Sequence, residues 1–146
     1  MRALRLLAAS LAILAACDIG TGPEPPTSGN VTRAWTATRC TYRSVADPAV
    51  EVELIGVGWE IGLFINDNGQ FFYVVTPPGG TEQNTPGTWD IAGSHLILAP
   101  TGSGATWDFR ASVDEDRMSL RGAAVTYDFD ADGTPDPATW NLTLVN

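Results

Sequence analysis

The chain has 146 residues, and its formal net charge of −9 arises from eight arginines, 17 acidic residues and no lysine. Nucleic acids and anionic lipid headgroups are bound through clustered Lys and Arg side chains, so we expect neither as a partner. The charge balance is compatible with cations, with neutral ligands and with a role in solubility alone.

The first 16 residues have the pattern of an export signal. A short basic start that contains Arg2 and Arg5 is followed by an almost unbroken run of Leu, Ala and Ile from Leu6 to Ala16. This run is about half as long as the roughly 20 apolar residues that a membrane-spanning helix needs. We therefore expect residues 1–16 to be a cleaved signal peptide.

The residues that end this run predict a lipid anchor. Leu14-Ala15-Ala16-Cys17 resembles the lipobox of bacterial lipoproteins. The resemblance implies that the Cys17 thiol carries diacylglycerol, that the signal is removed, and that the new amino terminus is acylated. Two or three acyl chains, at about 0.8 kcal/mol for each buried CH2, hold a protein firmly on a membrane. We expect a lipid-anchored protein of the bacterial cell envelope, facing the periplasm or the exterior; the alternative is an ordinary secretory signal.

A linker is predicted between this anchor and a single domain. The segment that follows Cys17 is rich in Pro, Gly, Ser and Thr and has no apolar periodicity, so we assign residues 17–30 to the lipidated cysteine and a flexible linker. Residues 31–146 are long enough for one core without disulfides. Lipidation of Cys17 would leave Cys40 unpaired, and we expect Cys40 to be buried as a small hydrophobic residue.

The domain has the pattern of an all-β fold. Short runs of β-branched and aromatic residues recur about every ten positions between turn residues, and helical periodicity is missing. We expect strands at 34–42, 50–54, 59–65, 71–75, 88–92, 95–99, 105–113, 117–129 and 138–145, with a long loop at 77–87. About eight to nine strands predict a small antiparallel up-and-down β-barrel, closed by pairing of the first strand with the last.

Several short motifs lie on or beside the predicted strands: Gly87-Thr88-Trp89, Leu96-Ile97-Leu98, Trp107-Asp108-Phe109, the run from Met118 to Gly122, and Leu142-Thr143-Leu144. Together these motifs resemble the lipocalin-like domains of small bacterial lipoproteins. The resemblance covers most of the domain from Trp35 onward and implies an eight-stranded barrel, often with a small apolar cavity. The first strand departs from true lipocalins because Arg33-Ala34 precede Trp35 where those proteins have a glycine-X-tryptophan motif.

The five tryptophans are the first candidate site. Each falls on a different predicted strand, so inward alternation can bring several of them into one barrel interior. In one interpretation they line a pocket for a hydrophobic or ring-shaped ligand. In the other they fill the core, because an eight-stranded barrel is just wide enough to be packed solid by side chains. The residues are Trp35, Trp59, Trp89, Trp107 and Trp140.

An acidic turn near the end of the chain is the second candidate site. Residues 128–136 resemble the first nine positions of a calcium loop of the D-x-D-x-D-G-x-x-D type. The resemblance implies a Ca2+ site with four side-chain ligands and one backbone carbonyl ligand. The alternative is an acidic, solvated hairpin that turns at Asp132-Gly133. The implied ligands are Asp128, Asp130, Asp132 and Asp136 through their side chains and Thr134 through its carbonyl group.

Catalytic machinery is not indicated. His95 is the single histidine, so zinc sites built on several histidines are excluded. It follows Gly93-Ser94 at a predicted hairpin, where we expect an exposed turn residue. Glu51 and Glu53 alternate with apolar residues and are expected on the wet face of a strand. No phosphate loop or dinucleotide motif is present. We therefore expect a protein that is not an enzyme and that needs no cofactor apart from the calcium considered above.

Two functions follow from these features. The first is a membrane-anchored envelope lipoprotein whose barrel binds a small hydrophobic ligand. The alternative is a structural or protein-interaction lipoprotein with a filled core, in which the 77–87 loop and the acidic hairpin contact an envelope protein. A cavity lined by several tryptophans would favour the first function, and a filled interior would favour the second.

Overall fold

The computed structural model describes residues 22–146, so the expected signal peptide, Cys17 and the start of the linker lie outside the described residues. Within this range no helix is long and apolar enough to cross a membrane. Almost all regular structure is strand. The elements are α1 (Ser28–Val31), β1 (Ala34–Ser44), β2 (Glu51–Glu53), η1 (Ile55–Val57), β3 (Glu60–Ile65), β4 (Gln70–Thr76), β5 (Gln83–Ala92), β6 (His95–Pro100), β7 (Trp107–Asp114), β8 (Arg117–Tyr127) and β9 (Asp136–Val145).

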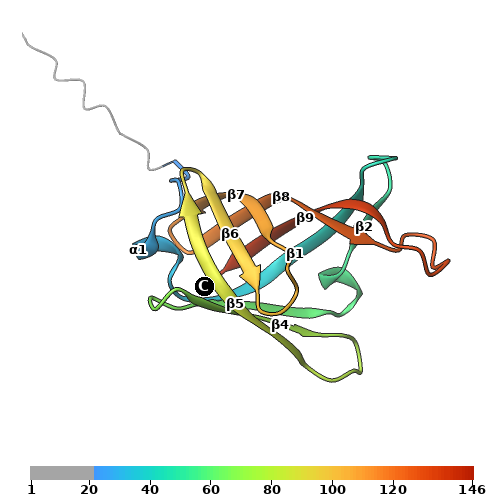
Figure 1. Ribbon diagram of the computed structural model, residues 1–146, viewed down its shortest axis with the longest axis horizontal. Coiled ribbons are helices and arrows are strands. Elements are labelled where there is room, and N and C mark those ends of the chain that lie inside the picture. The colour runs from blue at the N-terminus through green and yellow to red at the C-terminus, as the bar shows by residue number, and fades with distance from the viewer. Residues whose placement is uncertain (1–21) are drawn as a thin grey trace, which may run out of the picture.

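The strands form one closed antiparallel sheet. From β3 to β9 each strand pairs with the next along the chain, and β1 pairs with both β3 and β9 (Figure 1). Eight strands make the barrel, and the short β2 pairs with the second half of β1. The predicted up-and-down barrel, closed by its first and last strands, is confirmed. Closure leaves no long unpaired edge in the ring, which is the physical advantage of this topology.

β2 and β3 pair with different parts of β1, and the strand ladder is interrupted between them. η1 carries the chain across the break, and the Glu53 carboxylate accepts hydrogen bonds from the backbone N–H groups of Cys40, Ile55 and Gly56. Burial of Glu53 opposes its ionisation, but these three donors outweigh that effect and hold the pKa of the carboxyl below its usual value. Glu53 thus satisfies backbone donors that the interrupted ladder leaves open.

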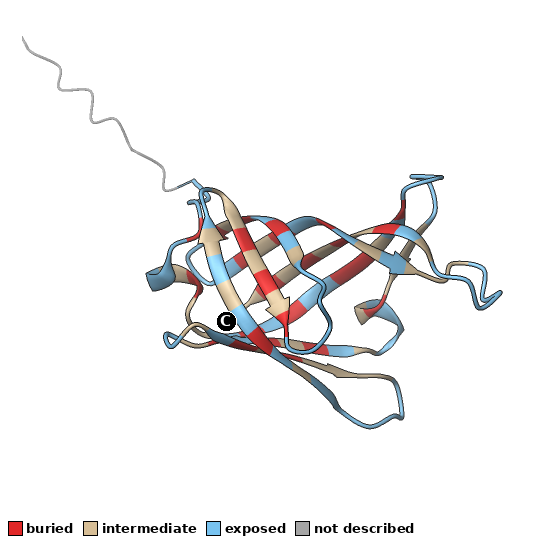
Figure 2. Ribbon diagram, in the orientation of Figure 1, coloured by how far each residue is buried: buried red, intermediate tan, exposed pale blue. Residues whose placement is uncertain are grey.

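Alternating side chains fill the barrel interior. On β9 the buried residues Ala138, Trp140, Leu142 and Leu144 alternate with more exposed residues, and β7 and β8 show the same alternation (Figure 2). Cys40 is fully buried on β1, as the sequence predicts. Two register shifts, between Ala37 and Arg39 and between Leu120 and Ala123, mark bulges that change which face the following residues occupy.

One end of the barrel is closed by the segment that precedes β1. Val31 of α1 is fully buried, and its carbonyl oxygen accepts a 2.8 Å hydrogen bond from the Trp35 indole N–H. Glu24 pairs with Val113 of β7 through two backbone hydrogen bonds, and Pro26 is buried. The sequence places residues up to 30 in a flexible linker, whereas residues from Glu24 onward pack on the barrel. This packing rests on contacts with distant strands, which local composition does not encode.

The predicted loop at 77–87 is shorter than expected. β5 begins at Gln83, and Pro86 pairs in register with Phe72 of β4. The Pro86 carbonyl accepts a hydrogen bond from Thr101, beyond the end of β6. In an antiparallel strand the N and C=O of one residue face the same neighbour, so the missing N–H of Pro86 does not interrupt the β4–β5 ladder. β7 begins two residues later and ends one residue later than predicted, and β8 ends two residues earlier than predicted.

Candidate functional site

The interior of the barrel has two halves of different character. Near the end that α1 closes, large side chains fill the interior and form a solid core. These side chains are almost completely buried. At the opposite end, where β1 and β8 finish and β7 and β9 begin, aromatic side chains surround an open pocket, which we call the mouth pocket. The buried residues of the solid half include Trp35, Leu63, Ile65, Phe71, Leu96, Phe109, Met118 and Leu144.

The mouth pocket has a volume of about 560 Å³. Four of the residues that line it carry aromatic rings: Tyr42 on β1, Tyr73 on β4, Trp107 on β7 and Trp140 on β9. Small or β-branched residues, Val125 among them, complete the lining. Pockets of roughly 300–1,000 Å³ with mostly apolar and aromatic walls are typical of small-molecule sites.

The four rings hold one another in fixed orientations. Trp107 and Trp140 meet edge to face with their centroids 5.0 Å apart, and Tyr73 meets both indoles edge to face, at 5.5 and 5.2 Å. Tyr42 lies nearly parallel to Trp140, with a centroid distance of 5.9 Å. Edge-to-face and offset-parallel pairs of this kind contribute about 0.5–1.5 kcal/mol each beyond the area that they bury. The walls of the pocket are therefore preformed.

Polar groups in the wall are neutral. The Trp140 indole N–H donates to Cys40 Sγ at 3.3 Å. Burial raises the pKa of the Cys40 thiol to about 11, so the thiol stays protonated at neutral pH. Burial also raises the pKa of Tyr42 and of Tyr73 well above that of a free phenol. Both tyrosines keep their hydroxyl protons and can donate to a ligand, and the pocket presents no charge from these groups.

Comparison with protein-family models, with curated proteins and with solved structures found no match to this chain. The likeness to lipocalin-like lipoprotein domains therefore stays a prediction. The site has to be interpreted from its own geometry.

The five tryptophans do not form one group. Trp107 and Trp140 line the mouth pocket, whereas Trp35 lies in the solid half of the core. Trp89 on β5 is half-buried, and its indole N–H donates to the carbonyl of Asn66 at 2.8 Å. Trp59 lies between η1 and β3, outside any strand, and packs on the margin of the core. Two of the five tryptophans therefore line a pocket, one fills the core, and Trp59 and Trp89 pack against its margin.

Two tyrosines of the pocket were not singled out by the sequence. Tyr42 and Tyr73 occupy inward positions of β1 and β4, as their neighbours Cys40 and Phe71 do. Alternation with these buried neighbours is the sequence signal that could have identified them. Their position at the open end depends on which strand ends coincide, and this follows only from the register.

The acidic turn brings three of its five predicted ligands together. The carboxylates of Asp128, Asp130 and Asp132 lie within 4.8 Å of one another. Asp136 is the first residue of β9 and pairs with Tyr127, and the Thr134 N–H donates to the Asp132 side chain. Carboxylates at this separation repel one another unless a cation or backbone donors offset their charge. The Asp128 carboxylate accepts hydrogen bonds from the N–H groups of Asp132 and Gly133. These backbone donors offset part of the repulsion between the carboxylates.

The cysteine and the histidine of the described residues lie apart. Cys40 is inside the barrel, whereas His95 begins β6 with a partly exposed side chain on the outer surface. The His95 Nδ1 atom lies 2.7 Å from a carboxylate oxygen of Asp108. Glu51 and Glu53 lie on the outer side of the barrel, as their alternation with Val52 and Leu54 predicts.

Proposed function

We propose that the protein is a lipid-anchored lipoprotein of the bacterial cell envelope whose barrel binds a small, ring-containing hydrophobic ligand in the mouth pocket. The observation that carries the ligand proposal is the four-ring wall around about 560 Å³. Tyr42 already stacks with Tyr127 and Trp140, so a flat apolar ligand would lie against the exposed part of Trp107, and a polar substituent on it would reach a tyrosine hydroxyl. The proposed anchor rests on the lipobox-like Leu14-Ala15-Ala16-Cys17.

The division of the barrel interior supports ligand binding over a purely structural role. A structural barrel needs only a filled core, and the α1 end of this barrel has one. At the other end four large rings contact one another around open space. Exposing aromatic surface to water costs about 25 cal/mol for each Å² that packing would otherwise bury. Tyr73 and Trp140 are already buried, so a ligand would recover this free energy on the partly exposed Tyr42 and Trp107.

Tryptophan fluorescence tests the ligand proposal. We would titrate the protein with a panel of neutral ring-containing compounds, including the probe N-phenyl-naphthylamine. We expect saturable quenching or energy transfer from Trp107 and Trp140, which line the pocket. Trp107→Leu should weaken binding about tenfold, because a lost ring contact and its buried area are together worth about 1.4 kcal/mol or more. Trp89→Leu is the matched control, since Trp89 is also half-buried but lies outside the pocket.

A filling variant completes this test. Val125→Trp places an indole into the pocket and leaves the four wall rings in place. It should abolish probe binding while the circular dichroism spectrum stays that of a folded barrel. Equal probe binding by the wild type, Trp107→Leu and Val125→Trp would contradict the mouth pocket as the site. No binding by any compound would contradict the ligand proposal and favour the protein-interaction alternative.

The anchor has its own test. In a bacterial host, the full chain should incorporate labelled palmitate and fractionate with membranes. Cys17→Ala should lose both properties, and Cys40→Ala, which removes the other cysteine, should keep them. Labelling that persists in Cys17→Ala would contradict the proposal.

A further inference from the structure

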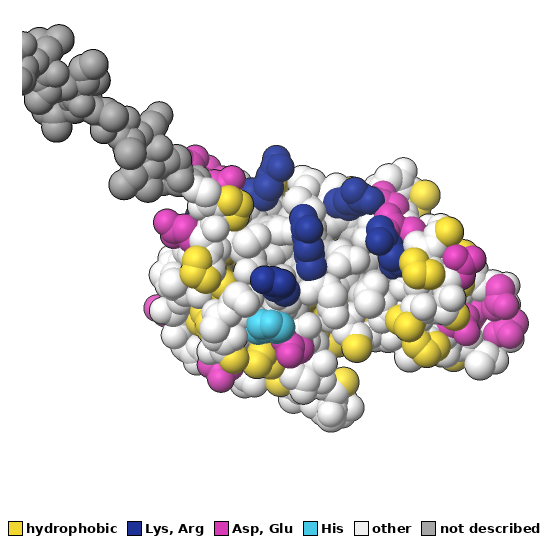
Figure 3. All heavy atoms as spheres, turned by 90° about the horizontal axis from the view of Figure 1, so that it is seen from above, with side chains coloured by type: hydrophobic (Ala, Val, Ile, Leu, Met, Phe, Trp, Pro, Cys, Tyr) yellow, Lys and Arg dark blue, Asp and Glu magenta, His cyan; other side chains and the backbone are white. Residues whose placement is uncertain are grey.

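The arginines of the domain gather on one face of the barrel. Residues 22–146 contain six arginines against 16 acidic residues, yet five of the six project from neighbouring strands (Figure 3). In the view of Figure 3 the basic side chains lie together, and acidic side chains lie mostly toward the margins. We call this surface the arginine face. Its arginines are Arg39 and Arg43 on β1, Arg110 on β7, and Arg117 and Arg121 on β8, all exposed, and β9 runs between β8 and β1.

Two of these arginines are direct cross-strand neighbours. Arg110 and Arg121 are Cα partners in the β7–β8 ladder, and His95 is the partner of Arg110 in the β6–β7 ladder. Like charges directly opposite each other on an exposed sheet face destabilise the pair. Within residues 22–146 neither Arg110 nor Arg121 has an ion-pair partner within 4.0 Å. An anion placed between them would relieve this repulsion.

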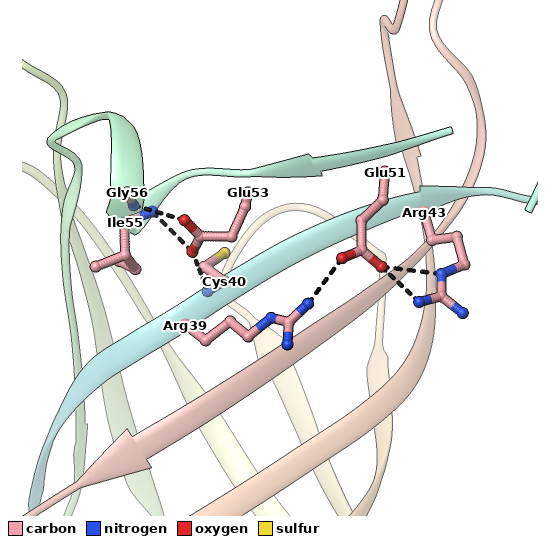
Figure 4. Close-up of polar contacts among 7 residues, drawn as sticks. All are labelled: Arg39, Cys40, Arg43, Glu51, Glu53, Ile55 and Gly56. Carbon is pink, nitrogen blue, oxygen red and sulfur yellow. Dashed lines mark hydrogen bonds and ion pairs between the residues drawn. The ribbon is translucent and has the colours of Figure 1, made fainter. Parts of the chain in front are cut away.

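The arginines of β1 are only partly neutralised. Both arginines form ion pairs with the Glu51 carboxylate, which lies 2.9 Å from Arg39 and 2.6 Å from Arg43 (Figure 4). One negative charge therefore faces two guanidinium groups, and donation from Arg43 and Arg39 lowers the pKa of Glu51. The pair keeps a net positive charge beside β9.

A bulge on β8 fixes the position of Arg121, which lies between Arg110 and the two arginines of β1. The ladder with β9 shifts between Leu120 and Ala123, so Arg121 and Gly122 form the bulge. Gly122 has a φ of 83°, and its N–H donates to the Asn141 side-chain oxygen at 3.0 Å. Arg121 Nε donates to the Ser119 hydroxyl at 3.1 Å. Bulges of this kind redirect a side chain and are frequent beside functional sites.

The arginine face is also hollowed. One hollow of about 360 Å³ lies between β1 and β8, with Arg39, Arg43 and Arg121 in its lining. A second of about 510 Å³ lies between β6 and β8, with Arg110, His95 and the His95-paired carboxylate of Asp108 in its lining. Both include Arg121 and Asn141, so the two hollows adjoin and cross the face. The groove that they form is longer than a single small anion requires.

From these observations we infer that the arginine face binds an acidic polysaccharide, a sugar chain that carries carboxylate groups. Guanidinium groups are suited to carboxylates. The uncharged lining between them offers hydroxyl and amide groups, from Ser119, Thr143 and Asn141, that can hydrogen-bond to sugar hydroxyls. Neither hollow is lined by a Phe, Tyr or Trp side chain on which a nucleic-acid base could stack. This site is on the outer surface, and its second hollow shares only Ala124 with the lining of the mouth pocket.

Binding to polygalacturonate tests the inference. The probe is a polyanion and the protein is acidic overall, so the long-range charge opposes their association. We expect saturable binding at about 0.1 M NaCl, where the Debye length is about 10 Å and the long-range repulsion is screened, and this binding should weaken as more NaCl is added, with neutral dextran inactive. The double variant Arg110→Gln/Arg121→Gln should bind at least about tenfold more weakly, as expected when charge-assisted hydrogen bonds are lost.

A control variant with the same net charge distinguishes the effect of the arginine face from the effect of net charge alone. Gln83→Glu/Asn84→Asp makes the same change in net charge on exposed residues of β5, across the barrel from β9. Its affinity should stay within about twofold of the wild type, since the altered charges lie beyond a Debye length of about 10 Å. Equal losses in the two double variants would overturn the inference. So would a wild-type protein that does not bind polygalacturonate.

A gain-of-binding variant provides an independent test. Glu51→Gln removes the one carboxylate that neutralises Arg39 and Arg43, so it should tighten polygalacturonate binding. Glu82→Gln, at an exposed glutamate outside the face, is the control and should have little effect. Equal effects of the two substitutions would contradict a local site. Binding to phosphatidylglycerol vesicles or to inorganic phosphate, with none to polygalacturonate, would overturn the polysaccharide as the occupant.

Discussion

At the scale of single residues, Gly87 shows how closely two parts of the barrel approach. It is buried on β5, where a Cβ atom would meet the carbonyl oxygen of Ala99 and the ring of Phe71. The carbonyl belongs to a paired strand and the ring to the solid half of the core. Neither can move without disturbing its neighbours.

Gly87→Ala should therefore lower the free energy of unfolding by about 1–3 kcal/mol, the usual cost of overpacking a core. Gly29→Ala in α1 is the control, because space is open there and alanine favours the helix by up to about 1 kcal/mol. Urea unfolding followed by circular dichroism measures both. A Gly87→Ala protein as stable as the wild type would show that the two strands are not packed this closely.

The Cys40 thiol should be unreactive in the folded protein. It is fully buried, and its pKa is raised to about 11, so the thiolate fraction at pH 8 is very small. In a Cys17→Ala variant, which leaves Cys40 as the single cysteine, a thiol reagent should react within minutes in urea and negligibly without it. Rapid labelling of the native protein would contradict the burial.

Glu53 should make stability depend on pH. Its folded-state pKa is lowered, so its stabilising effect is present above the ordinary value of 4.5 and is lost as the pH falls through the lowered value. Glu53→Gln should cost about 1–3 kcal/mol at pH 7, since hydrogen bonds to a charged group are lost. The difference from the wild type should shrink on acidification to about pH 3. Urea unfolding at both pH values checks this, with the exposed Glu60→Gln as control.

At the scale of elements, the acidic turn between β8 and β9 permits a metal-removal experiment. Three carboxylates of this turn lie within 4.8 Å of one another. We therefore expect the melting temperature to be higher in calcium than in a chelator. The gain should be about 1 kcal/mol at millimolar calcium for a weak extracellular-type site. Asp130→Asn should remove this difference, and Asp67→Asn, in another exposed turn, should keep it. Equal melting temperatures of the wild type in calcium and chelator would contradict a calcium site.

Most strands could be predicted because their two faces differ. On β9 and β7 inward residues are apolar and outward ones polar, so a period of two is visible in the sequence. The first part of β5 was assigned to a loop because it contains Pro86 and Gly87. Pro86 is tolerated because its nitrogen faces away from β4, which is a property of the pairing and not of the strand itself.

The sites could be predicted only in part. The sequence identified Trp107 and Trp140 together with three tryptophans that lie elsewhere, because alternation alone does not say at which height of the barrel a residue lies. The arginine face was missed for a similar reason. Arg39 and Arg121 are far apart in the chain, and only the β1–β9 and β8–β9 registers, with a bulge in each, bring them to one hollow.

At the scale of the whole molecule, closure of the sheet makes one cooperative unit. The seam between β1 and β9 places the buried Leu142 opposite Cys40, and Leu142 also pairs with Leu120 of β8. Since the core spans every strand of the ring, no part of the ring has a separate core of its own.

Leu142→Ala should cost about 2–5 kcal/mol, as for other buried leucines. Unfolding of the variant followed by tryptophan fluorescence and by far-ultraviolet circular dichroism should give coincident transitions, as in the wild type. Thr143→Ala, on the outer side of the same strand, should change stability by less than about 0.5 kcal/mol. Separate transitions for the two signals would contradict a single cooperative barrel.

The closed end of the barrel also sets an orientation. The described chain enters there, where Glu24 pairs with β7 and α1 covers the core, while the pocket opens at the far end. A protein held by lipid on Cys17 would stand with its sealed base toward the bilayer and its opening toward the aqueous phase. The proposed ligand would then be exchanged with the surrounding aqueous phase or with a partner protein on the far side of it. It would not be taken directly from the bilayer below.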